Sequence, residues 1–279
     1  MILVDKGESP LILCLPHSGT QIPPAIENRM NATGRLQTDI SWRLETILEV
    51  PSDLDATLLR STASRYVIDV DQPPELQQDP ETDPLNALCP VTTLDNKRIY
   101  QLDEEPGPTE TEQRALLFYY PFHDALRREV ERLKKIHDTV VLIDCRSVRS
   151  KIKGYIDREL AVINLGTAEQ TACHPDLART FAATFQGVDG ITVAVDDVFR
   201  GGYITRTYGL PDIGVHAMTL VIAQRAYLRH ESPPFEPDRT ESARLKTLLA
   251  QALGRVSEWA EGFEPDPAEQ IFDEDAEVS

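Results

Sequence analysis

The sequence predicts a single α/β domain with a mixed, mainly parallel sheet flanked by helices. Two observations lead to this prediction. Short apolar runs of strand length, rich in β-branched residues, recur along the chain. Between them lie segments whose apolar residues repeat with the period of a helix. Strands that alternate with helices are typical of α/β folds, in which helices cover a sheet of mainly parallel strands.

Six apolar runs have the length and composition of buried strands. They span residues 11–15, 66–70, 140–144, 161–165, 191–195 and 215–222. In open α/β sheets, ligands bind beyond the carboxyl ends of the strands. We therefore expect the functional site among the polar residues that follow these runs.

Four segments have the spacing of apolar residues expected for helices. They span residues 39–49, 109–137, 175–185 and 239–259. The second is the longest, with an apolar stripe formed by Leu116, Leu126, Val130 and Leu133. Residues 73–112 are rich in proline, aspartate and glutamate, which predicts a long irregular excursion before this helix.

Composition excludes several classes of function. The 279 residues carry a formal charge of −18, which repels phosphate backbones, so no nucleic-acid partner is expected. No run of apolar residues is long enough to span a membrane, and the N-terminus lacks the pattern of a signal peptide. The four cysteines are far apart, which favours reduced thiols and a cytoplasmic location.

The negative charge is concentrated at the C-terminus. Residues 264–279 hold seven acidic residues and no Lys or Arg, so removing them takes the charge from −18 to −11. We expect residues 1–263 to form the single domain and residues 264–279 to be a disordered, acidic tail. The oligomeric state is left open by the sequence.

Charged residues collect just after the predicted strands. Pro16-His17-Ser18 follows the first strand, Asp71 follows the second, and a segment with Asp144, Arg146 and Arg149 continues the third. A further segment, 196–206, holds two Asp, two Gly and two Arg. An acidic protein with arginines at one sheet edge suits a small anionic substrate or ligand.

Eight short motifs occur in an order that is specific in combination. They lie at residues 16–19, 38–39, 64–69, 120–123, 144–150, 164–167, 201–209 and 214–217. In this order they resemble the N-formylglutamate amidohydrolase (N-formylglutamate deformylase) family of histidine catabolism. The similarity extends from about Pro10 to Tyr227, which is most of the chain.

The resemblance implies a fold and a chemistry. The family is similar to zinc carboxypeptidases and aspartoacylases, with a phosphorylase/hydrolase-like α/β sheet, and it implies a zinc ion that polarises the acyl oxygen of an N-acyl acidic amino acid. His17 and Asp39 are then candidate metal ligands, and His17 and His123 candidate catalytic residues. The candidate substrate-binding residues are Arg65, Arg149, Asn164, Thr167, Gly202 and Arg206.

The sequence departs from the family pattern at the residues that carry the chemistry. Arg146 stands where members have a His that resembles a metal ligand, and a guanidinium has no lone pair to donate. Val221 stands where members have a Glu that resembles the general base. These changes argue against ordinary zinc binding. We expect Asp71 and Arg146 to form an ion pair in place of a metal.

Three interpretations therefore stay open. The first is a hydrolase that cleaves the amide of an N-acyl acidic amino acid. The second is a non-catalytic homologue that binds a small carboxylate without cleaving it, and the third is a different reaction that uses His17 or His123 as a base. Each candidate also has a structural interpretation, since His17 suits a turn, Asp39 suits a helix start, and the arginines suit neighbouring aspartates.

Overall fold

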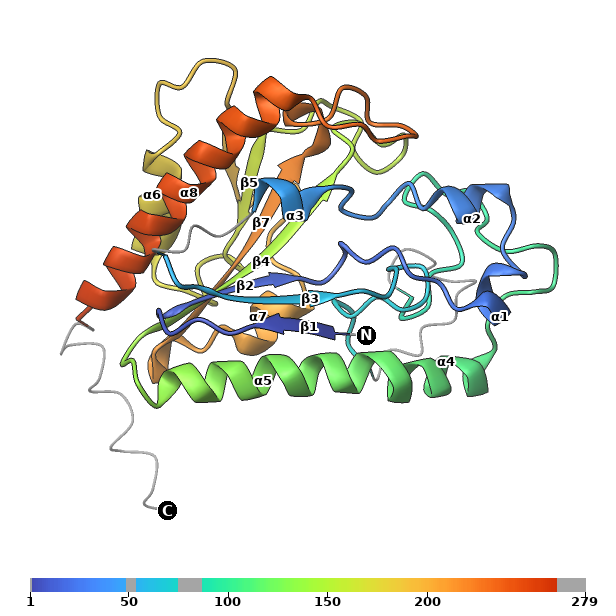
Figure 1. Cartoon of the computed structure of the whole chain (residues 1–279), viewed down its shortest axis with the longest axis horizontal. Coiled ribbons are helices and arrows are strands. Elements are labelled where there is room, and N and C mark those ends of the chain that lie inside the picture. The colour runs from blue at the N-terminus through green and yellow to red at the C-terminus, as the bar shows by residue number, and fades with distance from the viewer. Residues whose placement is uncertain (1, 49–53, 75–86, 265–279) are drawn as a thin grey trace.

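A seven-stranded sheet forms the centre of the molecule. The computed structural model describes residues 2–48, 54–74 and 87–264. The strands are β1 (Ile2–Asp5), β2 (Leu11–Leu15), β3 (Thr57–Ser61), β4 (Val140–Val148), β5 (Ile163–Gly166), β6 (Val193–Val195) and β7 (Val215–Ala223). Their order is β1-β3-β2-β4-β7-β5-β6 (Figure 1). The pairs β3–β2, β2–β4, β4–β7 and β5–β6 are parallel, while β1–β3 and β5–β7 are antiparallel. The predicted mixed, mainly parallel sheet is confirmed.

Helices cover both faces of this sheet. They are α1 (Pro24–Glu27), α2 (Ala32–Leu36), α3 (Leu44–Ile47), α4 (Pro108–Arg114), a π-helical turn (Ala115–Tyr119), α5 (Tyr120–Lys134), α6 (Pro175–Ala183), α7 (Tyr203–Tyr208) and α8 (Arg239–Gly262), with 3₁₀ turns at Pro211–Ile213 and Gln224–Ala226. In Figure 1, α5 runs along the lower edge and α6 and α8 lie together on the left. The predicted helices at 109–137, 175–185 and 239–259 are confirmed, and the first of them is interrupted by the π-helical turn.

The alternation of side chains along β2 divides the core into two layers. Leu11, Leu13 and Leu15 pack on the side of α3, α6 and α8. Ile12 and Cys14 pack on the opposite side, with α5 and α7. All five side chains are fully buried. A strand that is apolar on both faces must be covered on both faces, so the sequence of β2 requires a three-layer arrangement.

One predicted strand is wrong. Residues 66–70 form turns, because the backbone N–H of Val67 donates to the carbonyl of Ser64 and that of Asp69 donates to Leu88. Tyr66 and Val67 are buried against α1 and nearby loops, and Ile68 and Val70 are buried in the layer that contains α5, so their burial does not come from a strand ladder. An apolar run of this length does not distinguish the two, because periodicity reports burial and not backbone pairing. The carboxylate-bearing end of the segment nevertheless lies at the site.

The helix expected at 39–49 is also largely wrong. Within the described residues only α3, four residues long, forms there. Arg43 immediately before it adopts a left-handed conformation with φ of 60°, which prevents a continuous helix from Asp39. Two strands were not predicted, β1 and β3. β1 is half exposed at the sheet edge, and β3 alternates buried and half-buried residues with three polar side chains, so neither has a continuous apolar run.

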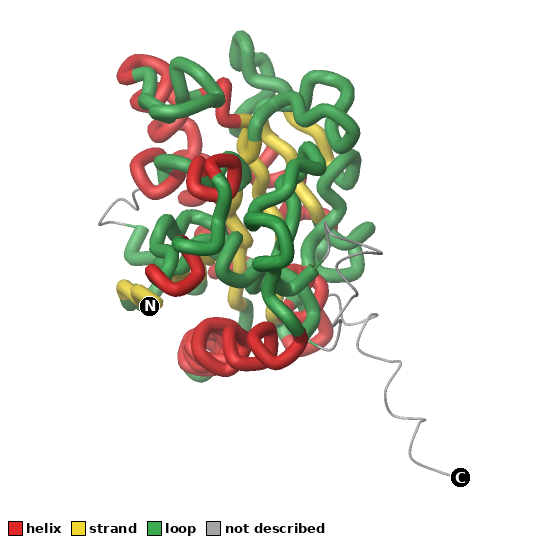
Figure 2. The backbone as a smooth tube through the Cα atoms, turned by 90° about the vertical axis from the view of Figure 1, so that its right-hand side faces the viewer, coloured by secondary structure: helices red, strands yellow, loops and turns green. Residues whose placement is uncertain are grey.

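Strand β4 continues past the predicted end at Asp144 to Val148. As a result, Asp144 and Arg146 belong to the strand itself and do not follow it. Figure 2 looks onto the end of the molecule where loops cover the ends of the strands. The predicted excursion at 73–112 lies partly outside the described residues and ends where α4 begins, and the predicted tail at 264–279 lies almost wholly outside them. No helix of the described residues has the length and apolar character that crossing a membrane requires.

Candidate functional site

A cavity of about 320 Å³ opens at the carboxyl ends of β2 and β4. Its walls come from the loop after β2, the turns at 65–72, strands β4 and β7, and the segment that leads into α7. Five of the predicted site residues line it: His17, Asp39, Arg65, Gly202 and Arg206. Asp69, Asp71, Arg146 and Val221 line it as well. The rule that ligand sites lie at the carboxyl ends of parallel strands therefore located the cavity correctly.

His17 is held at the base of the cavity by a buried carboxylate. Its Nε2 lies 2.7 Å from Oδ1 of Asp69. The other oxygen, Oδ2, accepts a hydrogen bond of 2.7 Å from Nε of Arg65, and Oδ1 also accepts one from the backbone N–H of Asp71. Asp69 thus fixes the orientation of the His17 ring. Among the described residues, Nδ1 of His17 has no hydrogen-bond partner.

Burial and charge set the protonation of this group. Despite burial, the positive charge of Arg65 and the contact with His17 hold the pKa of Asp69 far below its ordinary value. Burial lowers the pKa of His17, and this outweighs the opposing effect of Asp69. His17 is therefore a neutral imidazole at pH 7, with an anionic Asp69 beside it. This is the arrangement required of a general base.

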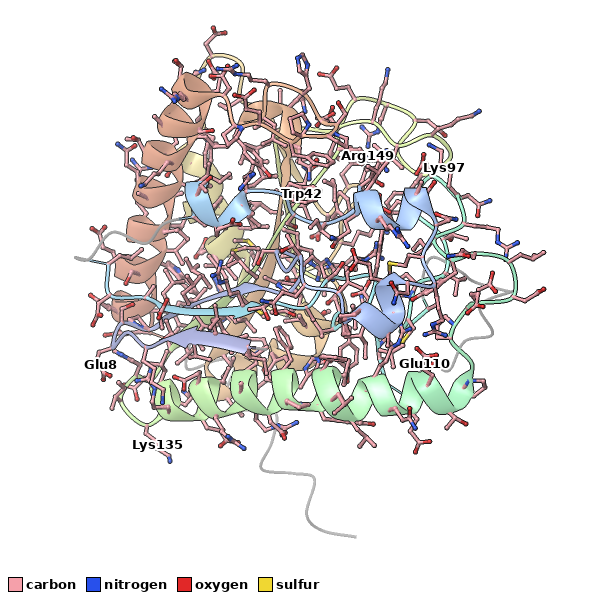
Figure 3. All side chains as sticks on the ribbon, turned by 45° about the vertical axis from the view of Figure 1, so that its right-hand side comes forward. Glu8, Trp42, Lys97, Glu110, Lys135 and Arg149 are labelled. Atoms are coloured by element: carbon pink, nitrogen blue, oxygen red, sulfur yellow. The ribbon has the colours of Figure 1, made fainter. Side chains whose placement is uncertain are left out.

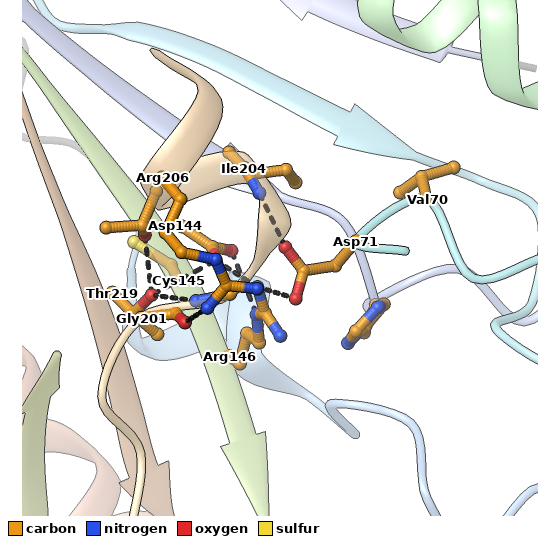
Figure 4. Close-up of polar contacts among 12 residues, drawn as sticks. Val70, Asp71, Asp144, Cys145, Arg146, Gly201, Ile204, Arg206 and Thr219 are labelled. Carbon is orange, nitrogen blue, oxygen red and sulfur yellow. Dashed lines mark hydrogen bonds and ion pairs between the residues drawn. The ribbon is translucent and has the colours of Figure 1, made fainter. Parts of the chain in front are cut away.

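Arg146 forms the second buried ion cluster, beside the first. Its Nη2 lies 2.6 Å from Oδ2 of Asp71 and also pairs with Oδ2 of Asp144, while its Nε donates to Oδ1 of Asp144 at 3.0 Å. The backbone N–H of Ile204, in the first turn of α7, donates to Oδ1 of Asp71 at 2.8 Å. Figure 4 shows Asp71 between Arg146 and Ile204. The predicted ion pair between Asp71 and Arg146 is confirmed.

The two departures from the family pattern are neighbours in the sheet. Arg146 on β4 pairs in register with Val221 on β7. Val221 is fully buried and carries no proton-transferring group. Both positions line the same cavity, so the His and the Glu that the resemblance implies at these positions would belong to one site.

Gly202 allows the loop before α7 to pack directly on this cluster. A Cβ atom at Gly202 would overlap Oδ2 of Asp71 and lie 2.5 Å from Nη2 of Arg146. Glycine is therefore required here by close approach, and its backbone forms part of the cavity wall.

We expect Gly202→Ala to destabilise the protein by about 1–3 kcal/mol, because the added methyl group displaces Asp71 from Arg146. Urea unfolding measures this change. Gly254→Ala is the matched control, since no atom lies within 4 Å of the added Cβ on α8. A helical Gly→Ala change there is expected to stabilise by about 0.5–1 kcal/mol. Equal effects at the two positions contradict the close approach at Gly202.

Asp39 and Arg149 serve mainly to join loops. Oδ1 of Asp39 accepts from Arg149 at 2.8 Å, and Oδ2 accepts from the hydroxyl of Tyr66 at 2.7 Å and from the N–H of Leu94 at 2.8 Å. Arg149 also approaches Asp95, which pairs with Lys97; Arg149 and Lys97 are labelled at the upper right of Figure 3. Arg149 does not line the cavity. Metal binding by Asp39 and substrate binding by Arg149 stay predictions.

Arg206 is the cavity cation best placed to bind an anion. Its guanidinium donates to the backbone carbonyl of Gly201, and it forms no ion pair with a carboxylate of the described residues. Arg200, also in the wall, pairs with Glu169 through exposed side chains, so this pair contributes little. Arg65 and Arg146, in contrast, are already paired with buried aspartates.

Besides Arg149, three predicted site residues lie outside the cavity wall. Asn164 donates to the carbonyls of Ala161 and Val221, and Thr167 donates to Asp196 from its backbone and hydroxyl. His123 lies between the carbonyl of Val70, at 2.8 Å from Nε2, and the hydroxyl of Tyr208, at 3.0 Å from Nδ1. These contacts hold backbone segments together. Direct roles for the three residues in binding or catalysis stay predictions.

The burial of His123 makes stability depend on pH. Burial lowers its pKa from 6.5 to about 4, so the unfolded chain takes up a proton below pH 6.5 while the native chain does not. Stability is fully present above pH 6.5 and is lost as the pH falls towards 4, by up to about 3 kcal/mol.

We expect His123→Gln to flatten this pH dependence, because Gln does not titrate and its amide still donates to the carbonyl of Val70. Urea unfolding at intervals between about pH 7 and pH 4.5 measures the slope for both proteins. An unchanged slope in the variant means that His123 is not the titrating group.

Comparisons with known proteins decide the family. A sequence model of the N-formylglutamate amidohydrolases matches residues 9–228. The chain belongs to the N-formylglutamate amidohydrolase family. An N-formylglutamate deformylase of Pseudomonas aeruginosa is 30% identical over 259 residues, which are 90% of this chain and 97% of that protein. One of Pseudomonas putida is 29% identical and covers 91% of this chain and 94% of its own length.

A solved structure supports the same family at the level of the fold. The crystal structure of an N-formylglutamate amidohydrolase from Ralstonia eutropha superimposes with a TM-score of 0.77 at 23% identity. The match covers 93% of this chain and 97% of that chain. The architecture of the N-formylglutamate amidohydrolases therefore extends over nearly the whole of this protein.

The side chains of this cavity do not fit the zinc ion that the resemblance implies. Nε2 of His17 is taken by Asp69, and all four oxygens of Asp71 and Asp144 accept bonds from Arg146 or Ile204. Among the described residues, no group of three or more His, Cys, Asp or Glu side chains is arranged to hold a metal ion. We therefore derive no chemical step from a metal.

Sequence reasoning missed part of the site. Asp69 was recognised only as a partner for an arginine, although its second oxygen orients His17. The sequence does contain a signal for Asp69, because it lies four residues after Arg65 in a segment next to the site. Tyr155 and Phe199, which also line the cavity, lie in loops without a pattern that would reveal them.

Proposed function

We propose that this protein hydrolyses the amide bond of a small N-acylated acidic amino acid, with N-formylglutamate as the first compound to test. The observation that carries the proposal is the His17–Asp69 pair in the wall of a cavity that also contains Arg206. Membership of the amidohydrolase family supports the reaction class, and the names of the two Pseudomonas relatives support the substrate.

His17 acts as the general base. Its neutral Nδ1 accepts a proton from water, and the water oxygen forms a bond to the acyl carbon of the substrate. When the carbon–nitrogen bond breaks, the same proton passes from His17 to the leaving amine. The products are a carboxylic acid, formate in the case of a formyl group, and the free amino acid.

Asp69 supports both proton transfers. It accepts the Nε2–H of His17, which places Nδ1 on the side of the ring that is free to accept a proton. The anionic carboxylate then stabilises the imidazolium that forms during the attack. Arg65 keeps Asp69 ionised and fixed, because its Nε donates to the oxygen that His17 does not use.

Arg206 binds a carboxylate of the substrate. It reaches the cavity from α7 and carries no carboxylate partner within the described residues. Arg200 adds positive charge to the same wall. A charged hydrogen bond of this kind contributes about 1.5–3 kcal/mol to binding.

We expect Arg206→Gln to weaken the binding of N-formylglutamate by roughly 10- to 100-fold. Isothermal titration calorimetry measures the dissociation constant. Arg179→Gln on α6, which removes an exposed arginine paired with Asp176, is the matched control. If both variants bind equally well, the substrate carboxylate does not contact Arg206.

Formate release tests the proposed reaction. The purified protein is incubated with N-formylglutamate, and formate and glutamate are measured in equal amounts if the amide is cleaved. N-acetylglutamate and N-formylalanine, in parallel, test whether the acyl group and the second carboxylate matter. No product from any of the three compounds contradicts hydrolysis.

A second candidate is a non-catalytic homologue that binds a small carboxylate. One observation favours it: Arg146 and Val221 lie side by side in β4 and β7, at positions where the resemblance implies a metal ligand and a proton-transferring Glu. In this case N-formylglutamate raises the melting temperature of the protein, yet no formate is released. The retained His17–Asp69 pair favours the hydrolase.

The proposal also covers the cellular compartment and the partners of the protein. The four cysteines are free and buried, which supports a reducing compartment and hence the cytoplasm. The charge of −18 argues against a nucleic acid as a partner, and the arginines of the cavity wall support a small anion as the ligand of the cavity, with no membrane partner proposed. If N-formylglutamate is the substrate, histidine catabolism is the process served.

A further inference from the structure

We propose that Arg146 is the resident cation of this site: its guanidinium stands where the family implies a metal, donates from Nη1 to the acyl oxygen of the ligand, and makes ligand binding independent of a divalent metal ion. The proposal rests on the proposed function for the identity of the ligand. It goes beyond it in naming the group that contacts the acyl oxygen.

The guanidinium is fixed on one side only. Nε and Nη2 are bound to Asp144 and Asp71, as described above. Nη1 has no hydrogen-bond partner within the described residues, and the side chain lines the cavity with 14% of its surface exposed. Two nitrogens of the guanidinium, Nε and Nη2, therefore hold the side chain in position, and the third, Nη1, is available to a ligand. This arrangement is preorganised, because the carboxylates hold the donor before the ligand arrives.

The surrounding carboxylates are committed to Arg146 and to the backbone. Asp144 is fully buried, and its Oδ2 also lies 3.4 Å from the hydroxyl of Thr219. Asp71 accepts from Ile204 and so joins β4 to the start of α7. A metal ion would have to displace Arg146 from both carboxylates while remaining next to its positive charge. Arg146, a residue of the sheet, therefore provides the positive charge of this site.

The position of Arg146 relative to His17 suits the acyl oxygen. Both side chains line the cavity, and Asp71 links them, because its carboxylate pairs with Arg146 and its backbone N–H donates to the carboxylate of Asp69 that contacts His17. A base that activates water and a donor for the acyl oxygen then face one carbon atom. The removal of such a donor from other enzymes costs roughly 10²–10³-fold in rate.

Zinc titration tests the metal part of the proposal. Calorimetry with zinc chloride should show no stoichiometric site in the unmodified protein. Arg146→His removes the cation and leaves two carboxylates beside a new imidazole, so this variant should bind one zinc ion, and zinc should raise its melting temperature. Arg244→His, which replaces an exposed arginine on α8, is the matched control and should behave like the unmodified protein. One zinc ion per unmodified chain overturns the proposal.

The unmodified protein alone provides a second measurement, so the test does not depend on the folding of a variant. The dissociation constant of N-formylglutamate should be the same in chelator and in zinc. If the chelator abolishes the binding of N-formylglutamate, the proposal about Arg146 is wrong. This result does not contradict the proposed hydrolysis. If binding survives chelation but no formate is released, the proposed hydrolysis is wrong and the resident cation stands.

Arg146→Lys tests the contact with the acyl oxygen. Lysine keeps the positive charge, but its single ammonium group cannot contact both aspartates and a ligand in the cavity as the planar guanidinium does. We expect the affinity for N-formylglutamate to fall roughly 10- to 100-fold. The affinity for glutamate, which lacks the acyl oxygen, should change little. Equal losses for the two ligands mean that Arg146 only supports the structure, and they overturn this part of the proposal.

Discussion

His17→Gln should lower kcat for formate release by roughly 10²–10⁴-fold and leave the dissociation constant of N-formylglutamate nearly unchanged. Nε2 of His17 lies 2.7 Å from Asp69. Gln keeps a hydrogen-bond donor for Asp69, but it cannot act as a base that accepts a proton. The loss therefore appears in the chemical step and not in binding. Single-turnover measurement of formate separates the two.

The control for this experiment is His137→Gln. His137 contacts the backbone carbonyl of Glu8 and does not line the cavity. Its replacement should leave kcat at the level of the unmodified protein. If His17→Gln retains full activity, His17 is not the general base, and another group in the cavity must take the proton.

Arg146→Met should lower the free energy of unfolding by about 3–5 kcal/mol at pH 7, since it leaves two buried carboxylates without their cation. Asp144 is fully buried and Asp71 is 6% exposed, so water cannot replace the lost partner. Met is apolar and of similar length, and therefore adds little change in packing. Urea unfolding gives the value.

The same variant should respond to pH in a defined direction. In the unmodified protein, burial raises the pKa of Asp71, and Arg146 opposes this increase. Without Arg146 the pKa rises further, so the penalty is largest at neutral pH and shrinks as the pH falls towards the ordinary aspartate value near 4. Arg244→Met, on the exposed surface of α8, should cost less than about 1 kcal/mol at any pH. A penalty for Arg146→Met that grows on acidification contradicts a buried ion cluster.

The long elements of this fold could be predicted from the sequence because their periodicity is strong. Strand β2 is apolar on both faces, and α8 runs through 24 residues with one buried stripe. The turns at 66–70 could not be recognised, because burial in a loop and burial in a strand leave the same apolar pattern. The edge strand β1 was missed for the opposite reason, since it is half exposed.

The candidate site shows the same division. His17, which follows β2, could be placed at the cavity from the α/β pattern alone. Asp71 also lines the cavity, but it follows turns and not the strand predicted at 66–70. The pairing of Arg146 with Asp71 could be predicted as well, but the partner of Arg149 could not. Arg149 pairs with Asp39, which is 110 positions away in the sequence, because loops after different strands meet at one edge. Spacing along the chain contains no information about such pairs.

We propose that the cavity of this amidohydrolase-family protein works with a guanidinium in the position of a metal ion. The most direct test is formate release from N-formylglutamate by protein that has been freed of metals, measured with chelator and with added zinc. We expect the same turnover with chelator and with added zinc. Turnover that requires zinc contradicts the role of Arg146, and no turnover in either condition contradicts hydrolysis and leaves a protein that only binds its ligand.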